Sequence, residues 1–254
     1  MRYFLRLLVC GVGLSRLIAS SGAAETAEQV WASLTGKLVS RPAFSYVENR
    51  PELPNVLIYG DSISIGYTPG VRKALGGQAN VYRIHLNGGD SGSFVGKLND
   101  LESAMRAPDL TGRWDFDWDV IHVNVGLHDL KYVNDLGKLD FENGALVATV
   151  QQYSANLRRI ITHLKKSAPE AKLIFALTTK VPPGSGGRIE EAELSYNAAA
   201  LAVLADYPEI AVNDLRTASL PFEQAGDVHF KPDGIAAQAA HVAEVITTHL
   251  PAKR

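Results

Sequence analysis

The feature that most constrains the fold is an alternation of short apolar runs with longer segments of helical periodicity. Rich in β-branched and aromatic residues, the short runs predict strands at 55–60, 80–85, 119–125, 172–178 and 208–213. The segments between them repeat apolar residues three and four positions apart, as amphipathic helices do. This alternation predicts a parallel sheet with helices on both faces. No linker-like stretch divides the 254 residues, so we expect one main domain.

Three helical segments carry apolar stripes that we expect to face the core. They run through 147–164, through 235–250, and through 189–205, where the stripe consists of Leu194, Ala198, Leu201 and Val203 or Leu204. Two loops, "KLDFENG" at 138–144 and "KVPPGSGGR" at 180–188, follow strand ends or site-adjacent segments. They are candidates to shape a substrate groove, although most of their residues are expected to be solvated connections.

The N-terminal residues have the pattern of a cleavable secretory signal. A basic start, an apolar middle and a small-residue end occupy residues 1–24, a stretch too short and too interrupted by Arg16 to form a stable membrane span. The alternative is a poorly ordered N-terminal arm. We therefore expect a signal peptide at 1–24, a lead-in at 25–50 and the domain at 51–254, in a secreted or periplasmic protein.

Composition excludes several function classes for the mature chain. Cys10 is the single cysteine and lies in the predicted signal peptide, so no disulfide, thiol nucleophile or cysteine metal site is available. Without that segment, 22 basic residues stand against 27 acidic ones, a net charge near -5. No basic stripe with interleaved aromatic residues is present, which argues against a nucleic-acid partner. The oligomeric state stays open.

Four short segments carry residues suited to chemistry. "GDS" at 60–62 follows the first predicted strand, "NGGDSG" at 87–92 the second and "GLHD" at 126–129 the third, while "GDVHFKPDG" at 226–234 precedes the last helix. The carboxyl ends of parallel strands meet at one edge of a sheet, where ligands bind in α/β proteins. We therefore expect these segments to converge.

The residue types in these segments predict nucleophilic catalysis. The hydroxyl of Ser62 needs a base to take its proton, and His229 is the candidate because imidazole is largely neutral near pH 7. Asp227, two residues earlier, is placed to orient that imidazole and to offset its developing charge. Backbone N–H groups of Ser62 and Gly89 are candidate donors to an oxyanion, since glycine lets its amide approach a ligand closely.

Taken in this order, the four segments resemble the SGNH or GDSL hydrolases, a family of serine esterases, and the resemblance spans about 55–250. It implies a flavodoxin-like three-layer α/β/α sandwich with a five-stranded, mainly parallel sheet. It also implies hydrolysis by a cooperating serine, glycine, asparagine and histidine, with Ser62 as nucleophile, Gly89 as oxyanion donor and His229 as base. This mechanism requires neither a metal nor another cofactor.

The third segment departs from the family pattern. "GLHD" stands where the family has Gly-x-Asn-Asp, so His128 replaces the asparagine donor. An imidazole N–H is also a donor, and His128 is therefore expected in the oxyanion hole. Its tautomer must then be fixed, by Asp129 or by a backbone carbonyl.

The fourth segment departs in the position of the acid. The family places aspartate three residues before the base, and that position here is Gly226. Asp227 is the expected triad acid. Glu223 is an alternative, as is a dyad in which a carbonyl orients His229.

We therefore expect a serine esterase that forms an acyl-enzyme from an O-acyl ester. Because no long apolar lid is evident, short acyl groups such as acetyl on a carbohydrate are favoured, and the expected partner is a small-molecule or carbohydrate ester. A noncatalytic binding domain and an acyltransferase are the alternatives. A zinc site made of His128, Asp129, Asp227 and His229 is disfavoured, because no helical or strand spacing pairs two of them as ligands.

Overall fold

A five-stranded parallel sheet forms the centre of the protein. The computed structural model describes residues 24–251. Its strands lie in the order β2-β1-β3-β6-β7, and every neighbouring pair is parallel. Their bounds are β1 Asn55–Gly60, β2 Asn80–Arg83, β3 Val120–Asn124, β6 Lys172–Ala176 and β7 Ala211–Asn213. The predicted α/β fold with five strands is confirmed, and the last strand is shorter than expected.

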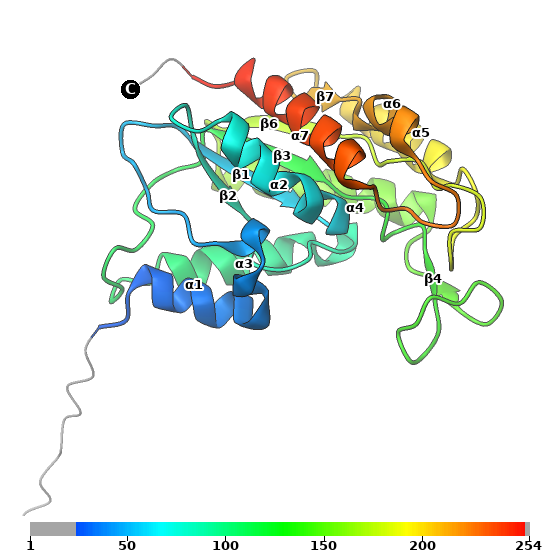
Figure 1. Ribbon diagram of the computed structural model, residues 1–254, viewed down its shortest axis with the longest axis horizontal. Coiled ribbons are helices and arrows are strands. Elements are labelled where there is room, and N and C mark those ends of the chain that lie inside the picture. Colours follow the sequence, from blue (N-terminus) through cyan, green and yellow to red (C-terminus); the bar gives the residue numbers. More distant parts are fainter. Residues whose placement is uncertain (1–23, 252–254) are drawn as a thin grey trace, which may run out of the picture.

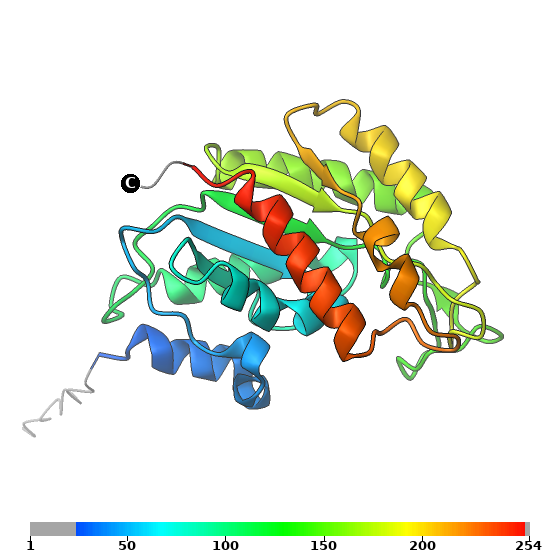
Figure 2. The ribbon, with the colours of Figure 1, turned by 45° about the horizontal axis from the view of Figure 1, so that its top comes forward.

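Helices cover both faces of this sheet (Figure 1). The α-helices of the described residues are α1 Ala27–Thr35, α2 Ser62–Ala74, α3 Phe94–Met105, α4 Val150–Ser167, α5 Glu193–Leu204, α6 Leu215–Ser219 and α7 Pro232–Thr247. On one face α2 and α7 lie side by side (Figure 2), and α6 packs on α7. On the other face α4 packs between α3 and α5, which follows from right-handed crossovers in this strand order.

Short elements complete the chain. They are the 3-10 helices Gly36–Ser40, Pro42–Phe44, Ser91–Ser93 and Leu220–Phe222, and the strands β4 Tyr132–Val133 and β5 Ala145–Leu146. The two strands form a small antiparallel sheet whose connection projects from one end of the molecule (Figure 1).

Two of the predicted apolar stripes face the core, and the third is out of phase. In α4 the stripe from Tyr153 to Leu164 is buried, and the helix begins at a capping box between Thr149 and Gln152. In α5, by contrast, Leu194 and Leu201 are 46% and 44% exposed, and only the end of the expected stripe, at Val203 and Leu204, is buried. The expected core face of that helix is therefore wrong over most of its length.

Polar side chains explain the phase of α5. The carboxylate of Glu193, fully buried, accepts hydrogen bonds from the Val181 N–H at 3.0 Å and from Arg216 Nε at 2.9 Å. The side chain of Asn197 accepts the Thr178 N–H at 2.8 Å. These bonds fix the face of α5 that is buried, which also carries Tyr196, Ala200, Val203 and Leu204.

The segment expected as a lead-in packs on the domain. Helix α1 lies against α3, and its Trp31 is 2% exposed. The Trp31 indole N–H donates to the carbonyl of Phe44 at 2.7 Å, and Phe44 is itself fully buried. The predicted signal peptide lies almost wholly outside the described residues. Within 24–251 no helix combines the length and apolar character needed to cross a membrane.

Candidate functional site

The first strand delivers Ser62 to the carboxyl edge of the sheet. Strand β1 ends at Gly60, where a Cβ would lie 2.8 Å from the Cβ of Ser64, so the turn accepts only glycine without rearrangement. Asp61 caps α2, because its carboxylate accepts the Ile63 N–H at 2.9 Å. Ser62 is thus the first residue of α2, and its own N–H finds no partner among the described residues.

Asp61 is buried beneath this turn, with 2% of its surface exposed. Burial raises the pKa of its carboxyl to about 6, against the lowering effect of the Ile63 amide and of nearby cations. Its contacts are therefore those of a capping residue that holds the start of α2.

Ser62, His229 and Asp227 form a continuous chain of contacts. The Ser62 Oγ lies 2.9 Å from His229 Nε2, and His229 Nδ1 lies 2.8 Å from Asp227 Oδ1. A carboxylate only accepts hydrogen bonds, so Nδ1 carries the proton and Nε2 is left to accept the serine O–H. The side chains of His229 and Asp227 are 53% and 52% exposed, so this chain of contacts is open to solvent.

A local turn explains the two-residue spacing of acid and base. Gly226, which occupies the position of the family's aspartate, has a left-handed φ of +79°. Asp227 accepts the backbone N–H of His229 at 3.0 Å as well as its ring N–H, and the backbone bond is the main cause of a lowered Asp227 pKa. Glu223, the alternative acid, instead binds Lys180 Nζ at 3.1 Å.

His128 is oriented by Lys131, a contact that the sequence did not suggest. The Lys131 Nζ lies 3.1 Å from His128 Nδ1. An ammonium group has donors only, so Nδ1 accepts and the neutral ring carries its proton on Nε2. Burial, with added repulsion from Lys131, Arg188 and Lys97, lowers the pKa of His128 to about 3. The imidazole is therefore neutral at ordinary pH, with an N–H donor at Nε2.

Asp129 does not orient His128. It is fully buried, and its carboxylate accepts the N–H and the hydroxyl of Ser91. This contact ties the segment behind β3 to the segment behind β2. No group of three histidine, cysteine, aspartate or glutamate side chains within 24–251 is arranged to hold a metal ion, so His128, Asp129, Asp227 and His229 do not converge as ligands.

Gly89 lies in the second segment, with its amide already engaged. Its φ is +71°, a conformation that favours glycine. The Gly89 N–H donates to the side chain of Asn87 at 2.9 Å. Lys97 closes the other side of this loop, because its Nζ donates to the carbonyls of Asn87 at 3.2 Å and Gly88 at 2.8 Å.

Three cations at this site were not predicted from the sequence: Lys97, Lys131 and Arg188. Arg188 Nε donates to the carbonyl of Leu127 at 3.3 Å, next to His128. One signal was available for Arg188, since the loop at 180–188 was a candidate groove. For the two lysines no motif pointed to the site.

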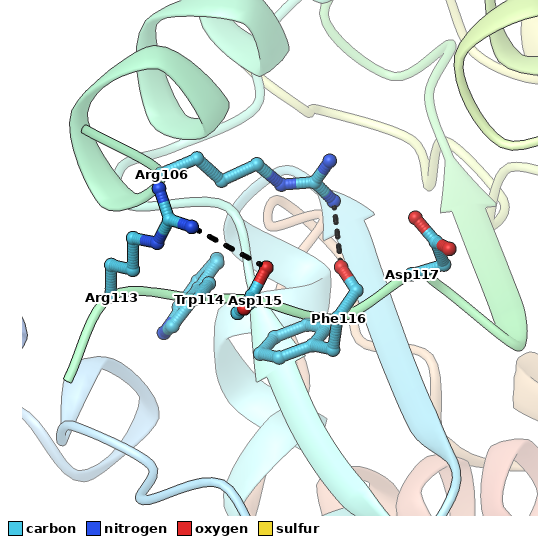
Figure 3. Close-up of a pocket in the computed structure, with 6 residues that line it drawn as sticks. All are labelled: Arg106, Arg113, Trp114, Asp115, Phe116 and Asp117. Atoms are coloured by element: carbon cyan, nitrogen blue, oxygen red, sulfur yellow. Dashed lines mark hydrogen bonds and ion pairs between the residues drawn. The ribbon is translucent and has the colours of Figure 1, made fainter. Parts of the chain in front are cut away.

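A separate cavity of about 200 Å³ lies in the connection between α3 and β3 (Figure 3). The Arg106 guanidinium donates to the Phe116 carbonyl there at 3.1 Å. This connection enters β3 at its amino end, whereas Ser62 follows the carboxyl end of β1, so the cavity is not part of the candidate site. It is lined by Arg106, Arg113, Trp114, Asp115, Phe116 and Asp117.

The fold and the site together define the class of protein. A sheet of order β2-β1-β3-β6-β7 between two helical layers is the SGNH hydrolase fold, and a serine, a histidine and an aspartate meet at its carboxyl edge. The model of the GDSL-like lipase/acylhydrolase family matches residues 58–237, more than half of the chain. The chain therefore belongs to this family of ester hydrolases.

Solved structures share this fold at low sequence identity. A lipase/acylhydrolase from Enterococcus faecalis is 18% identical with a TM-score of 0.56, over 79% of this chain and 99% of that one. An acetylxylan esterase from Geobacillus stearothermophilus is 14% identical with a TM-score of 0.56, over 79% of this chain and 96% of that one.

A third similar structure is a carbohydrate esterase family 2 enzyme with a carbohydrate-binding domain, from Corynascus thermopiles (Myceliophthora fergusii). It is 16% identical with a TM-score of 0.52, and the match covers 77% of this chain but only 66% of that longer one. A sequence search against curated proteins finds no match.

Proposed function

We propose that the protein is a serine esterase that hydrolyses short-chain O-acyl esters through an acyl-enzyme. The observation that carries the proposal is the contact chain from Ser62 Oγ to His229 Nε2 at 2.9 Å and from His229 Nδ1 to Asp227 Oδ1 at 2.8 Å. It has the geometry that an activated serine requires. Membership of an acylhydrolase family supports the same reaction.

Acylation follows from the protonation states in this chain. Ser62 Oγ attacks the ester carbonyl carbon while its proton passes to His229 Nε2, and the carbonyl oxygen becomes an oxyanion. The His229 imidazolium then gives that proton to the leaving alcohol oxygen as the ester C–O bond breaks. Between these two proton transfers, Asp227 holds the His229 ring in place and offsets its positive charge. Water, deprotonated by His229, attacks the acyl-enzyme in the second half and releases the acid and Ser62.

The oxyanion is proposed to bind between Ser62, His128 and Gly89. The free N–H of Ser62 and the Nε2–H of His128 are available donors. The Gly89 N–H joins them when the Asn87 side chain releases it, so Asn87 must turn away as substrate binds. Donors fixed before the reaction stabilise the transition state more than the bound ester.

The acyl group is proposed to be short, and the alcohol a carbohydrate. The half-exposed histidine and aspartate leave little apolar surface to bury a long chain. Two of the similar structures are an acetylxylan esterase and a carbohydrate esterase, which favours an O-acetyl sugar. Turnover of 4-nitrophenyl acetate, butyrate and octanoate tests the chain length, and kcat/KM is expected to fall along this series.

The serine mechanism is tested by Ser62→Ala. We expect turnover of 4-nitrophenyl acetate to fall to the background of the remaining groups, about 10³-fold or more below the wild type. Ser195→Ala, which removes an exposed hydroxyl on α5, is the matched control and should retain full activity. A folded Ser62→Ala variant with undiminished turnover would refute the assignment.

The acceptor of the acyl group and the site of action are part of the proposal. With water as acceptor, acetate release should equal alcohol release even when a competing sugar alcohol is present. Formation of the new sugar ester instead would identify an acyltransferase. Secretion is proposed from the pattern of residues 1–24, and the mature protein should begin near Ala24 or Glu25.

A further inference from the structure

Three cations stand at the edge of the candidate site without an acidic partner. Lys97, Lys131 and Arg188, here called the cation cluster, are each partly exposed. Within residues 24–251 none of them has a carboxylate oxygen within 4.0 Å. Each donates instead to neutral acceptors, namely backbone carbonyls or the His128 imidazole.

By contrast, three other cations of the fold are paired with acids or closed off. Lys180, which borders the same loop, binds Glu223 at 3.1 Å, and Arg216 binds Glu193 at 2.9 Å. Arg83 also lacks an acid within that distance, but it is fully buried against the Phe44 ring and reaches no ligand. Single exposed cations without an acid within 4.0 Å, such as Lys73 and Lys166, also occur in the described residues. The cation cluster differs from them because three such charges gather around His128.

The cluster surrounds the proposed oxyanion donors. Lys97 Nζ lies 2.8 Å from the Gly88 carbonyl and would stand 2.7 Å from a Cβ placed on Gly89. Lys131 Nζ lies 3.1 Å from the His128 ring. Arg188 Nε lies 3.3 Å from the carbonyl of Leu127, the residue before His128. All three lower the pKa of His128, as charges that share one neighbourhood must.

Two chain segments bring Lys131 and Arg188 to the same place. The N–H of Tyr132 donates to the carbonyl of Gly187 at 2.7 Å. Lys131 directly precedes Tyr132 and Arg188 directly follows Gly187, so this hydrogen bond holds the two cations at the same place. Gly187 has a φ of +63°, and a Cβ there would meet Leu139 at 2.8 Å. The contact between these two segments is therefore fixed by the fold.

The nearby acids are occupied by their own contacts. Asp61 caps α2, Asp129 binds Ser91, Asp227 binds His229, and the side chain of Asp90 accepts the Ser93 N–H at 3.1 Å. Asp61 and Asp129 are also buried, with 2% and 0% of their surface exposed. They offset the charge of the cluster at a distance, but they do not occupy its hydrogen-bond donors.

We propose that Arg188, supported by Lys97 and Lys131, binds a carboxylate carried by the ester substrate, such as that of an O-acetylated uronic acid. The inference rests on the proposed esterase function and narrows its substrate class. Arg188 is the specificity-determining residue because its planar guanidinium retains N–H donors beyond those given to Leu127 and Gly186.

Matched substrates that differ only in charge test this inference. One pair is O-acetylated methyl glucuronoside and O-acetylated methyl glucoside, with acetate release as the readout. A second pair is the 4-nitrophenyl monoester of succinic acid and 4-nitrophenyl butyrate, which places the carboxylate on the acyl part. We expect kcat/KM for the anionic member of at least one pair to be about tenfold to a hundredfold higher at low salt. The pair that shows the preference identifies the part of the ester that bears the carboxylate.

Variants separate a local contact from net charge. Arg188→Gln should bring the ratio of kcat/KM for the anionic member to kcat/KM for its neutral partner down to about one, whatever its absolute turnover, and Arg188→Lys should keep part of the preference. Arg158→Gln removes the same charge from an exposed pair with Asp206 on α4 and should leave the preference intact.

The two hypotheses fail in different ways. Equal kcat/KM within both pairs, together with normal turnover of 4-nitrophenyl acetate, would overturn the carboxylate subsite and leave the esterase standing. So would a preference that Arg188→Gln and Arg158→Gln reduce equally. Loss of all ester turnover in the wild type would instead refute the esterase proposal on which the inference rests.

Discussion

Replacing His128 with alanine removes one donor from the proposed oxyanion hole. Loss of a single such donor lowers kcat by about 10²–10³-fold, or about 2.7–4 kcal/mol of transition-state stabilisation. The upper end of that range is expected here because the Gly89 N–H is shared with Asn87, which leaves Ser62 and His128 as the donors that are free beforehand. KM should change little, since the oxyanion exists only in the transition state.

His128→Asn is the control that separates a donor from a mere space-filling side chain. The Lys131 ammonium that now faces Nδ1 can donate to the asparagine carbonyl, which turns the amide N–H groups toward the position of Nε2. We expect kcat of this variant to stay within about tenfold of the wild type. The assay is steady-state hydrolysis of 4-nitrophenyl acetate by variants with unchanged circular dichroism. The oxyanion role of His128 is refuted if His128→Ala keeps a third of the wild-type kcat, or if both variants are equally inactive.

Three further predictions address the acid, the buried carboxyl and the helix packing. Asp227→Asn should lower kcat by about 10²–10³-fold, less than for a fully buried triad acid, while Glu223→Gln retains activity; the reverse order would identify Glu223 as the acid. The pKa of Asp61 in the folded protein is about 6, above its ordinary value of 3.8. The folded state therefore binds the carboxyl proton more tightly than the unfolded state does, and the free energy of unfolding falls as the pH rises between these two values. In urea titrations the stability of Asp61→Asn relative to the wild type should therefore rise by about 3 kcal/mol from pH 3.5 to pH 7, and a constant difference contradicts this. Gly70→Ala places a Cβ 2.5 Å from that of Ala239 and should destabilise the protein by about 1–2 kcal/mol, whereas Gly96→Ala, which meets nothing, should stabilise it slightly; equal effects would exclude the close α2–α7 contact as the cause.

Local signals were sufficient to predict the sheet and the positions of the site segments. An apolar run followed by Gly60 and Asp61 predicts a buried strand, a tight turn and a helix cap from residues within one short stretch. Because parallel strands end at a common edge, the order of the segments was enough to predict which of them meet. The sequence could not supply the distances between Ser62, His229 and Asp227.

The features that could not be predicted depend on contacts between distant segments. The phase of α5 is set by Glu193 and Asn197, whose buried hydrogen bonds to other segments outweigh the apolar stripe through Leu194. Periodicity counts apolar residues and does not register such bonds. The packing of Trp31 also depends on contacts with distant segments. For that reason a core residue was not predicted in the segment expected as a lead-in.

The orientation of His128 was expected to come from its neighbour Asp129 or from a carbonyl. Asp129 is drawn to Ser91 instead, and Lys131 supplies the contact. A lysine three residues from a histidine is a common spacing with no motif value. Only the turn after β3 brings the Lys131 ammonium to the His128 ring.

The proposed mechanism depends most on Ser62 as an activated nucleophile, and covalent labelling measures that property directly. The wild-type protein treated with a fluorophosphonate should gain one adduct by intact mass, and peptide mapping should place it on Ser62. His229→Ala should slow the labelling strongly, because the base that takes the serine proton is gone. A folded wild-type protein that stays unlabelled at high probe concentration, or that carries the adduct on another residue, would contradict the proposed mechanism.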